Sequence, residues 1–479
     1  MARQLMILEV SQKQAYIFAS RKVRDNRLRS AQIAYVTGSE FFEKVCPELY
    51  GRDNLVYAGG GHTVLQFSSR EQARAFGAAV SRQVMQDYPG MELFIQQREY
   101  DEALTPGENL LELSKALETK KSHRIASFRY NGLGVEDLSL RRSAEWIATE
   151  SAPPDGWNYM SRTEQIAADV GFLAVVHLDG NAMGTRVQKI YDDCGDDWER
   201  CRQLLQLFSA QIDQHFDEAF TEMAADLGAA LEKAGDPCAR MRQLPLRRII
   251  GAGDDVCFVT AGDMGLECAA SFLRHLNQKV NEADRQRYTA CAGVVLIHSR
   301  FPFRKAYDLS EALCSNAKQF CAERGGNISG VDYHIEFGTM KDSLGDIRQD
   351  YFAEDGTYME LRPLAVTVGE GAVVPAERRY QFFMDMLEQF RNSAHLVPRS
   401  KLKQLRTAIA QGEVETRYAL RATGVDEIVR RCVEVGRQAH TGDELYFDET
   451  TGSSTLRRCL FFDAIEWMDH TTLWKEGET

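Results

Sequence analysis

The stretch IIGAGDDVCFVTAG, Ile249–Gly262, places two adjacent aspartates in a turn between two apolar runs. Adjacent carboxylates repel each other unless a cation or an amine lies between them, so Asp254 and Asp255 favour a metal site. Glycine and aspartate are also ordinary residues of a solvated hairpin turn. The stretch alone leaves both interpretations open, and the surrounding sequence has to decide between them.

Strand and helix patterns alternate around this turn. FLAVVHLD is typical of a buried strand, and after GNAMG a long helical region follows. The turn joins the strands LRRIIGA and DVCFVTA, and a helix, the strand region YTACAGVVLIHS, the helix FRKAYDLSEALCSNAKQFCAE and the strand ISGVDYHIE come after it. The core order β-α-β-β-α-β predicts a ferredoxin-like α+β domain, with an antiparallel sheet that carries helices on one face.

The N-terminal part of the chain repeats this order. QLMILEVS, the hairpin NLVYAGGGHTVLQF and MELFIQQREY are strand-like, and helical patterns separate them. We therefore expect an internal duplication. When YAGGGHTVLQF is placed over IGAGDDVCFVT, Gly61 and His62 stand at the aspartate positions, and Ser11 falls near the position of Asp179. Only the second copy is predicted to carry the carboxylates.

These patterns predict four regions and an overall α+β class. After about Gly338 we expect helices only, such as RRYQFFMDMLEQFRNSA and LRRCLFFDAIEWM, which would form a C-terminal helical bundle. The predicted domains are 1–100, a first and degenerate palm-like domain; 101–165, a helical linker region; 166–340, a second and catalytic palm-like domain; and 341–479, a C-terminal helical domain.

Composition limits the function classes. A chain of 479 residues with 44% hydrophobic residues can fill about three globular cores. Its net charge of -13 argues against broad binding of nucleic acid, although SRKVRDNRLRS is either a phosphate-facing helix or a solvated one. The 11 cysteines form no CxxC pair, which favours reduced structural thiols. No apolar run is long enough to span a bilayer and no signal peptide is visible, so we expect a cytoplasmic protein.

The carboxylates are predicted to meet at one edge of the second sheet. Asp179 ends a strand, and Asp254 lies at the tip of the adjoining hairpin, so a ferredoxin-like sheet brings them side by side. Asp179, Asp254 and Asp255 are therefore the candidate catalytic residues and Mg²⁺ ligands. Two such ions could activate a ribose 3'-hydroxyl and stabilise the leaving pyrophosphate.

Five neighbouring residues are candidates for binding a nucleotide. Gly180 and Gly184 would let the backbone approach a phosphate, and the helix that starts near Asn181 would offer free N–H groups to it. Gly253 permits the tight turn. Lys318 could neutralise phosphate charge, although a surface lysine on a helix would have the same pattern.

Four motifs of the second copy and two of the first resemble a known protein family. HLDGNAMG, GAGDDV, AGVVLIHSRFPFRKAYDLSEALCSNAK and SGVDYH, in this order, resemble the catalytic palm of the CRISPR polymerase family, the large subunit of type III CRISPR interference complexes. They resemble the GGDEF diguanylate cyclases more distantly. QKQAYIFASRKVRDNRLRSAQIAYV and YAGGGHTVLQF are similar to the first, non-catalytic palm of that subunit, and YMELRPL and the C-terminal helices resemble it more weakly.

The resemblance implies a function in prokaryotic antiviral defence. It implies synthesis of cyclic oligoadenylates from ATP, with Mg²⁺ or Mn²⁺ at the palm carboxylates. It further implies that Lys318 contacts phosphate and that Gly60 and Gly61 lie near a second nucleotide. Guide RNA and small CRISPR effector subunits would be the partners.

Three departures from the family pattern are visible. Ala252 replaces the first glycine of the usual Gly-Gly-Asp-Asp turn, and alanine does not favour a positive φ, so an altered turn is expected. The sequence begins directly in the first palm and contains no His-Asp dipeptide, so neither an HD nuclease domain nor DNA cleavage is expected. The zinc-binding cysteine cluster often found between the palms is also missing.

Two alternatives to an effector subunit remain open. The chain could be a stand-alone cyclic dinucleotide synthase, for which a homodimer is one expected state. The missing nuclease and zinc parts would favour this alternative. It could instead be a non-catalytic scaffold that binds RNA and protein subunits, as the carboxylate-free first copy would favour. The retained carboxylates of the second copy argue against the scaffold.

Overall fold

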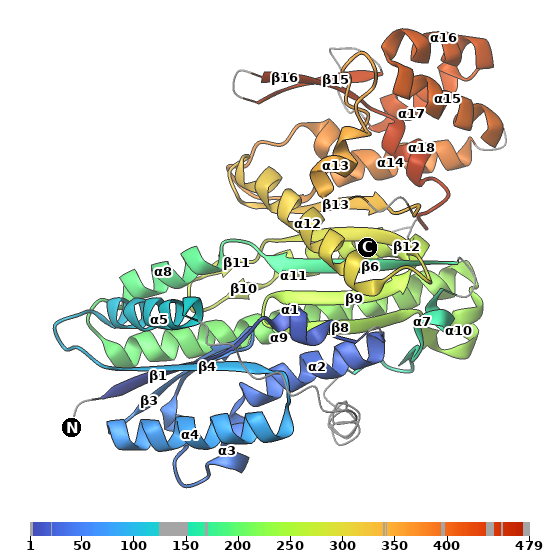
Figure 1. The fold of residues 1–479 in the computed structure, drawn as a ribbon. Coiled ribbons are helices and arrows are strands. Elements are labelled where there is room, and N and C mark those ends of the chain that lie inside the picture. The colour runs from blue at the N-terminus through green and yellow to red at the C-terminus, as the bar shows by residue number, and fades with distance from the viewer. Residues whose placement is uncertain are drawn as a thin grey trace.

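The chain folds around two main β-sheets joined by helices (Figure 1). The computed structural model describes residues 3–20, 22–123, 152–167, 171–338, 341, 343–393, 398–436, 445–451 and 454–472. Both sheets combine with long helices in this part of the chain, which confirms the predicted α+β class. The section of the predicted linker region between residues 124 and 151 lies outside the described residues.

The first sheet has four strands in the order β2-β3-β1-β4, and every neighbouring pair is antiparallel. Its strands are β1 (Gln4–Ser11), β2 (Leu55–Gly59), β3 (His62–Phe67) and β4 (Glu92–Glu99). The helices of this region are α1 (Lys13–Ile17), α2 (Val23–Val36), α3 (Ser39–Val45), α4 (Arg70–Asp87) and α5 (Pro106–Ser122), with the 3-10 turn η1 (Arg52–Asn54). Figure 1 shows α4 below the sheet and α5 above it.

The second sheet has six strands in the order β14-β13-β12-β6-β9-β8. Only the β12–β13 pair is parallel. Its strands are β6 (Phe172–Gly180), β8 (Leu246–Ala252), β9 (Asp255–Ala261), β12 (Ala290–His298), β13 (Ile328–Ile335) and β14 (Leu364–Val368). The set β12-β6-β9-β8 has the same antiparallel order, by position in the chain, as the four strands of the first sheet.

Helices cover both faces of this second sheet. At Gly293 of β12, a Cβ atom would lie 1.9 Å from the Ser310 carbonyl oxygen of α12, and at Gly265 of α11 it would lie 2.2 Å from the Ala174 Cβ of β6. We predicted helices on one face of this sheet only, but the further helix α12 covers the opposite face. Because both faces are buried, the strands are continuous apolar runs. The helices and short strands of this region are α7 (Thr163–Ile166), α8 (Met183–Cys194), α9 (Trp198–Ala234), α10 (Pro237–Met241), α11 (Gly265–Gln278), α12 (Phe303–Ala322), η3 (Gly262–Met264), β5 (Asn158–Tyr159), β7 (Gln243–Leu244), β10 (Val280–Asn281) and β11 (Gln286–Arg287).

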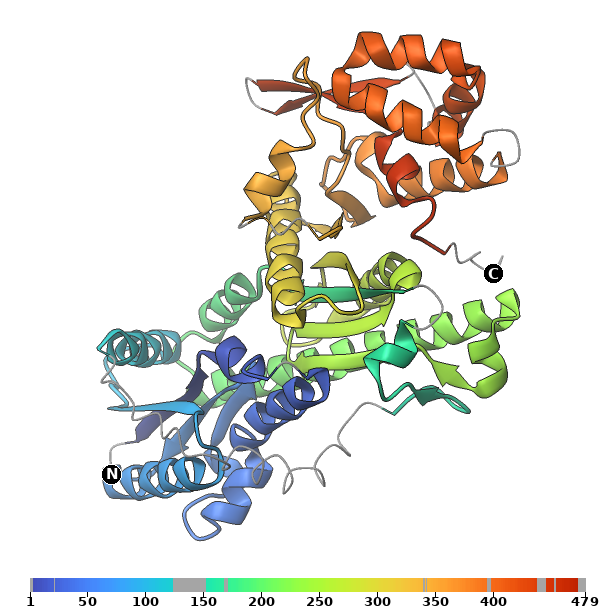
Figure 2. The same ribbon diagram turned by 45° about the vertical axis from the view of Figure 1, so that its right-hand side comes forward.

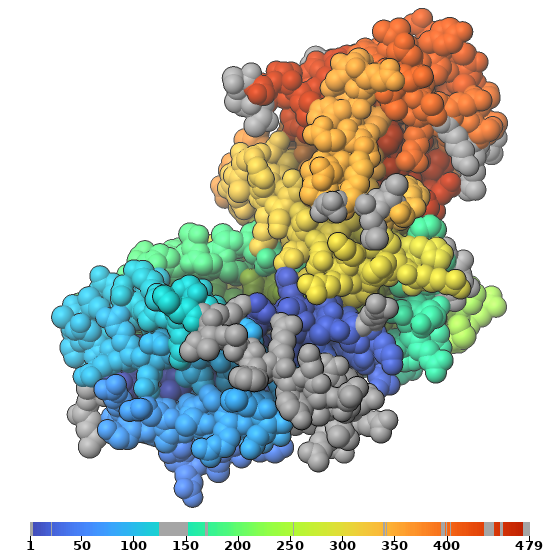
Figure 3. Space-filling view, viewed as in Figure 1, coloured from blue at the N-terminus to red at the C-terminus, as the bar shows by residue number. Residues whose placement is uncertain are grey.

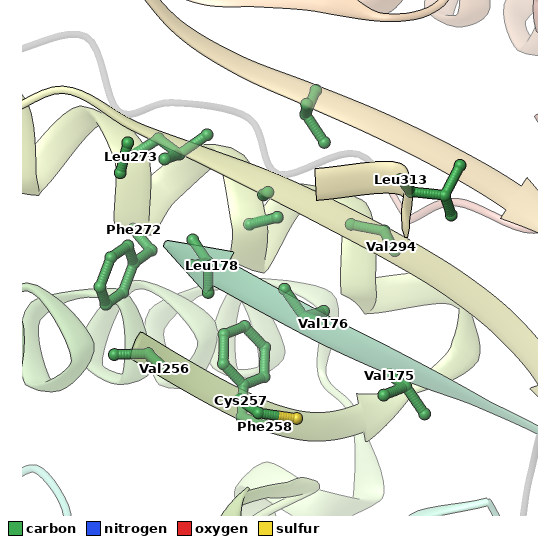
Figure 4. Close-up of a cluster of buried hydrophobic side chains, with 14 of the residues drawn as sticks. Val175, Val176, Leu178, Val256, Cys257, Phe258, Phe272, Leu273, Val294 and Leu313 are labelled. Carbon is green, nitrogen blue, oxygen red and sulfur yellow. The ribbon is translucent and has the colours of Figure 1, made fainter. Parts of the chain in front are cut away.

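The hydrophobic core lies on both sides of β6. Figure 4 shows Leu178 and Val176 of β6 among side chains from β9, β12 and the helices that flank the sheet. Leu178 and Phe258 are fully buried. Burying one such side chain contributes about 1.5–3 kcal/mol, so this core fixes the ends of β6 and β9 where the aspartates lie.

The C-terminal part contains strands that the sequence did not predict. Besides β14, a hairpin pairs β15 (Tyr446–Thr451) with β16 (Ser454–Cys459). LRRCLFFDAIEWM was interpreted as one helix, but β16 ends at Cys459 and α18 (Phe462–Trp467) begins after it, because strand pairing overrides the local helical spacing. The other elements are α13 (Leu344–Gln349), η4 (Ala376–Arg378), α14 (Tyr380–Asn392), α15 (Arg399–Gln411), α16 (Glu413–Thr423) and α17 (Asp426–Gly436).

The three parts are stacked, with the second sheet in the middle (Figures 2 and 3). Phe18, which follows α1, packs against the rings of Phe303 and Tyr307 on α12, with centroid distances of 5.9 and 4.3 Å. On the other side, the Trp198 Nε1 of α9 donates a hydrogen bond to Gln66 Oε1 of β3 at 2.9 Å. The first and second sheets are therefore joined by direct side-chain contacts.

Several sequence predictions about single residues can be compared with these positions. Arg29 of the basic stretch is buried and donates to the Tyr16 carbonyl at 2.9 Å, so at this residue the helix is neither solvated nor phosphate-facing. All 11 cysteines are buried and free, as predicted. None of the helices in the described part of the chain is both long and apolar enough to cross a membrane.

Candidate functional site

The second sheet brings the three predicted aspartates to one edge. Asp255 is the first residue of β9 and lies opposite Asp179 of β6 in the strand register. It also lies opposite Ala252, the last residue of β8, so Gly253 and Asp254 form the turn. The strand order therefore places Asp179 beside the hairpin, as the ferredoxin-like arrangement predicts.

A single glycine makes the turn possible. Gly253 has a φ of +66°, a left-handed conformation that favours glycine. Ala252 belongs to the strand and pairs with Asp255, so the missing first glycine of the family pattern does not prevent the turn. The Gly253 N–H donates to Asp213 Oδ1 of α9 at 2.9 Å. Asp213 is not among the predicted site residues, because only the fold brings α9 against the turn.

Gly180 is required by close packing, whereas Gly184 is not. A Cβ atom at Gly180 would lie 2.4 Å from Met183 Cε and 3.0 Å from Asp254 Cβ, and its N–H donates to the Asp254 carbonyl at 3.2 Å. A Cβ atom at Gly184 would meet nothing within 4 Å. Close backbone approach is therefore a feature of Gly180 alone.

The helix after Asp179 starts later than predicted. α8 begins at Met183, and the N–H of Asn181 donates to the Thr289 carbonyl at 2.9 Å. The Asn181 amide Nδ2 donates to the Ile328 carbonyl at 3.0 Å. Asn181 therefore connects the end of β6 to the start of β12 and to β13, and its backbone N–H is not free to bind a phosphate.

Lys318 lies within the carboxylate cluster. Its Nζ is 2.8 Å from Asp179 Oδ2 and also donates to the Gly180 carbonyl at 2.8 Å. Burial opposes the charged ammonium, but the Asp179 carboxylate outweighs it and raises the pKa of Lys318. Lys318 is thus the charged counter-ion of Asp179. It lies where its ammonium could contact a phosphate, and where Asp179 could bind a cation.

The Asp-Asp pair is arranged to hold a cation. Burial, followed by repulsion from Asp179, raises the pKa of Asp254 to about 6 and that of Asp255 to about 7. His177 is 3.6 Å from Asp255 Oδ1, but burial lowers the His177 pKa to about 4, so the imidazole is neutral near pH 7. Asp255 Oδ1 is a buried oxygen without a hydrogen-bond partner among the described residues. Hard oxygen ligands with uncompensated charge fit Mg²⁺ or Mn²⁺.

A tighter group of acids lies elsewhere in the described part of the chain. Ligand atoms of Glu360, Asp463 and Glu466 all lie within 4.8 Å of one another. Arg362 is fully buried among them and its Nη2 lies 2.8 Å from Glu466 Oε2. Arg348 contacts Glu360 at 2.7 Å. Because arginines already compensate these carboxylates, the group is a buried ion network and not a metal site.

The first sheet contributes its own hairpin to the same region. Gly60 and Gly61 have φ values of +56° and +76°, and a Cβ atom at Gly253 would lie 3.3 Å from the Gly60 backbone nitrogen. Lys13 donates to the Gly60 carbonyl, and Gln14 Nε2 donates to Glu311 Oε1 of α12 at 2.5 Å. The two hairpins therefore touch at the predicted site.

The register corrects one sequence assignment. Glu9 lies opposite His62, as Asp179 lies opposite Asp255. Likewise the Val10 N–H donates to the Gly61 carbonyl, as that of Gly180 donates to the Asp254 carbonyl. Glu9, not Ser11, thus occupies the position of Asp179, and the first copy is not free of carboxylates. The sequence alone does not give this assignment, because it depends on the register between β1 and β3.

Glu9, like Asp179, forms an ion pair with a lysine of a helix. Lys121 Nζ of α5 lies 2.9 Å from Glu9 Oε1, and Lys318 lies 2.8 Å from Asp179. Both sheets therefore combine a strand-end carboxylate with a lysine from a nearby helix. The first copy differs in the turn, where Gly61 and His62 replace the aspartates.

Comparisons with known proteins agree with the fold. Residues 172–325 match the model of the Cas10/Cmr2 family, second palm domain. No curated protein sequence matches the chain. Among solved structures, Csm1 of T. onnurineus is 14% identical, with a TM-score of 0.57, over 98% of this chain and 70% of that one.

Two further structures are similar over 91% of this chain and 70% of theirs. A Csm1-Csm4 cassette in complex with cA4 has 13% identity and a TM-score of 0.55. The cassette in complex with AMPPNP has 13% identity and a TM-score of 0.54. At these identities the similarity concerns the fold.

Proposed function

Because residues 172–325 match the second palm domain of the Cas10/Cmr2 family, we propose that this chain is a nucleotidyltransferase that converts ATP to cyclic oligoadenylates in antiviral defence. One observation carries the proposal. Asp179, Asp254 and Asp255 meet at one sheet edge, with the pKa of both turn aspartates raised by burial and by repulsion from Asp179. Such a site gains most from a bound divalent cation.

The proposed reaction is an in-line displacement. A ribose 3'-oxygen forms a bond to the α-phosphorus of a second ATP, the bond from that phosphorus to pyrophosphate breaks, and the hydroxyl proton is released. Mg²⁺ or Mn²⁺, when bound, would supply charge neutralisation for the triphosphate. Asp179, Asp254 and Asp255 would hold the cation. The Lys318 ammonium would then leave Asp179 and contact a phosphate oxygen.

The touching hairpins support a second nucleotide position on the first sheet. We read the two sheets as tandem ferredoxin-like palms, residues 1–100 and 166–340, with 101–165 between them and a C-terminal domain at 341–479. Gly60 and Gly61 lie beside Gly253, so a nucleotide held there would face the carboxylates. The acceptor ATP would bind at the second palm and its partner at the first.

The solved structures that resemble the chain support a subunit rather than a stand-alone enzyme. Two of them contain Csm1 together with Csm4, one in complex with cA4 and the other with AMPPNP. By analogy we propose that this chain joins an effector complex with guide RNA and smaller subunits. A stand-alone synthase would instead release a short product, such as a cyclic dinucleotide, without any partner.

One observation favours the scaffold as a second candidate. Lys318 already neutralises Asp179 at 2.8 Å and so competes with a cation for the same carboxylate. If the Lys318 ammonium stays paired with Asp179, the palm domain would keep its fold but would not catalyse nucleotide transfer. Measuring cation binding therefore separates the two functions.

The test is product analysis with the purified chain, alone and with its assembled complex and target RNA. ATP and Mg²⁺ or Mn²⁺ should give pyrophosphate and a cyclic adenylate that mass spectrometry identifies. Asp254→Asn should abolish both products, whereas Asp87→Asn, on α4, which contributes no residue to the site, should not. A parallel calorimetric titration with Mn²⁺ should show binding that Asp254→Asn weakens.

Two outcomes would refute the proposal. The absence of product from any nucleoside triphosphate under all of these conditions would exclude the enzyme. Mn²⁺ binding that is absent, or equal in Asp254→Asn and the parent chain, would exclude the cation site and favour the scaffold.

A further inference from the structure

A groove runs along the first sheet, on an edge that the nucleotide site does not use. Its volume is about 610 Å³. One wall is α4 and the base is the edge strand β4, while α5 contributes Lys120 from the opposite side (Figure 1). Met6, Ala73, Gly77 and Ile95 provide an apolar floor. The groove therefore lies beside an open sheet edge and not at a loop.

The edge strand offers unused backbone donors. The Tyr100 N–H donates to the Arg3 carbonyl at 2.8 Å, so alternate residues from Tyr100 back along β4 face β1. The intervening residues face outward, and Lys120 Nζ indeed donates to the Ile95 carbonyl at 2.6 Å. No described residue accepts a hydrogen bond from the outward N–H groups. These belong to Leu93, Ile95, Gln97 and Glu99.

The groove is cationic although the chain is acidic. Arg70 and Arg74 lie one turn apart on α4 and form no ion pair with any described residue. Lys120 adds a third cation, and Arg98 is already paired with Glu112 at 3.2 Å. Against them the groove holds one carboxylate, that of Glu99. In a chain of net charge -13, this local excess of cations favours an anionic occupant.

We propose that this groove binds an extended acidic segment of a partner protein, which adds to the sheet as a strand beside β4. Outward N–H groups two residues apart match the carbonyls of an added strand, whose like-facing residues are about 6.6–6.8 Å apart. Carboxylates on the face of the added strand towards α4 would meet Arg70 and Arg74, and the alternate apolar side chains would lie on the opposite face of the sheet.

Other occupants fit less well. A second copy of this chain would place the three cations of one groove against those of the other. Single-stranded RNA would satisfy the cations, but it would set its phosphates along an edge that also carries outward carbonyls. The acidic strand satisfies both the outward N–H donors of β4 and the cations of α4.

The test uses a fluorescein-labelled peptide of about eight residues, alternating glutamate and valine, with binding to the full chain followed by fluorescence anisotropy. A strand added at an edge uses the N–H and C=O groups of every second residue only. N-methylation of one alternate set of peptide nitrogens should therefore abolish binding, and N-methylation of the other set should leave it intact. A purely electrostatic complex would treat the two isomers alike.

Matched variants identify the groove. Arg74→Glu should weaken peptide binding about tenfold or more, since a cation at the groove becomes an anion, whereas Arg82→Glu on the same helix but outside the groove should not. Ala78→Trp should fill the groove and block binding, and Ala75→Trp, on the same helix and outside it, is the steric control. Circular dichroism verifies that each variant is folded.

Three results would overturn the proposal. The first is equal binding of the two N-methylated isomers. The second is equal loss of binding in Arg74→Glu and Arg82→Glu. The third is binding of a labelled oligouridylate in the groove when the peptide does not bind, which would assign the groove to RNA. The readout does not depend on nucleotide chemistry, so it succeeds or fails independently of the proposed function.

Discussion

In the folded chain, Asp254 and Asp255 are partly protonated near neutral pH. Burial and the neighbouring Asp179 raise their pKa values to about 6 and about 7. Both exceed the usual aspartate value, so each group contributes stability that is complete below about pH 4 and is lost as pH rises through the folded-state pKa. A cation reverses this cost, because it binds the deprotonated forms.

The first prediction follows from the raised pKa values of the two aspartates. Mg²⁺ or Mn²⁺ affinity should rise as pH increases from about 5.5 to about 8, since the aspartates must lose their protons before they bind. Calorimetric titration in buffers of different ionisation enthalpy measures both the affinity and the protons released. In Asp255→Asn the proton release should fall. A cation affinity that stays constant across this pH range would contradict the pKa assignment.

The second prediction concerns the two glycines that follow Asp179. Gly180→Ala should reduce activity by one or more orders of magnitude, because the added Cβ would lie 2.4 Å from Met183 Cε and 3.0 Å from Asp254 Cβ. Gly184→Ala should keep near-parental activity, because its Cβ would meet nothing within 4 Å. Steady-state rates of pyrophosphate release compare the two variants. Equal rates would mean that the packing at Gly180 does not position the turn.

At the scale of elements, the sequence predicted those strands and helices whose formation depends mainly on the pattern of their own residues. The apolar strand around Val176 and the long helix α9 followed from periodicity, because each buries a continuous face. The C-terminal strands could not be predicted in this way, since β16 exists through its pairing with β15 and not through its own pattern. Asp213 was missed for a similar reason, because its contact with Gly253 joins residues 40 positions apart.

The buried ion network shows how elements are fixed to one another. Arg348 of α13 links Asp332 of β13, at 2.6 Å, to Glu360, at 2.7 Å. Arg362 continues the chain of contacts from Glu360 to Glu466 of α18. SGVDYH and YMELRPL, two of the motifs that carry the family resemblance, thus contribute Asp332, Glu360 and Arg362 to one network. Their role here is to attach the C-terminal part to the second sheet.

The third prediction tests that attachment. Arg362→Met should lower the local free energy of unfolding by about 3–5 kcal/mol, because buried carboxylates would lose their cation. Arg457→Met is the control: its ion pairs with Glu413 and Asp448 are partly exposed, and we expect a loss of about 0–1 kcal/mol. Native-state hydrogen exchange of β13 and α18 measures both. The network would not hold these elements if the two variants exchanged at the same rate.

At the scale of the whole molecule, the proposed site exists only because two similar sheets face each other. The glycine hairpin of the first sheet lies against the aspartate hairpin of the second, and Gln14 reaches Glu311 on the helix that also carries Lys318. Relative motion of the sheets would therefore change the distance between the two proposed nucleotide positions. The contact between Gln14 and Glu311 is a place where this coupling can be measured.

The fourth prediction is a double-mutant cycle across that contact. Gln14→Glu should place a carboxylate against Glu311, whose pKa is already raised by burial, and should reduce activity most at high pH, where both groups are charged. Glu311→Gln should restore much of the loss in the double variant, with a coupling energy of about 0.5–3 kcal/mol. Rates of pyrophosphate release at pH about 6 and about 8 give all the terms of the cycle. Additive effects at both pH values would mean that the two sheets act independently, and that the second sheet carries the chemistry without the first.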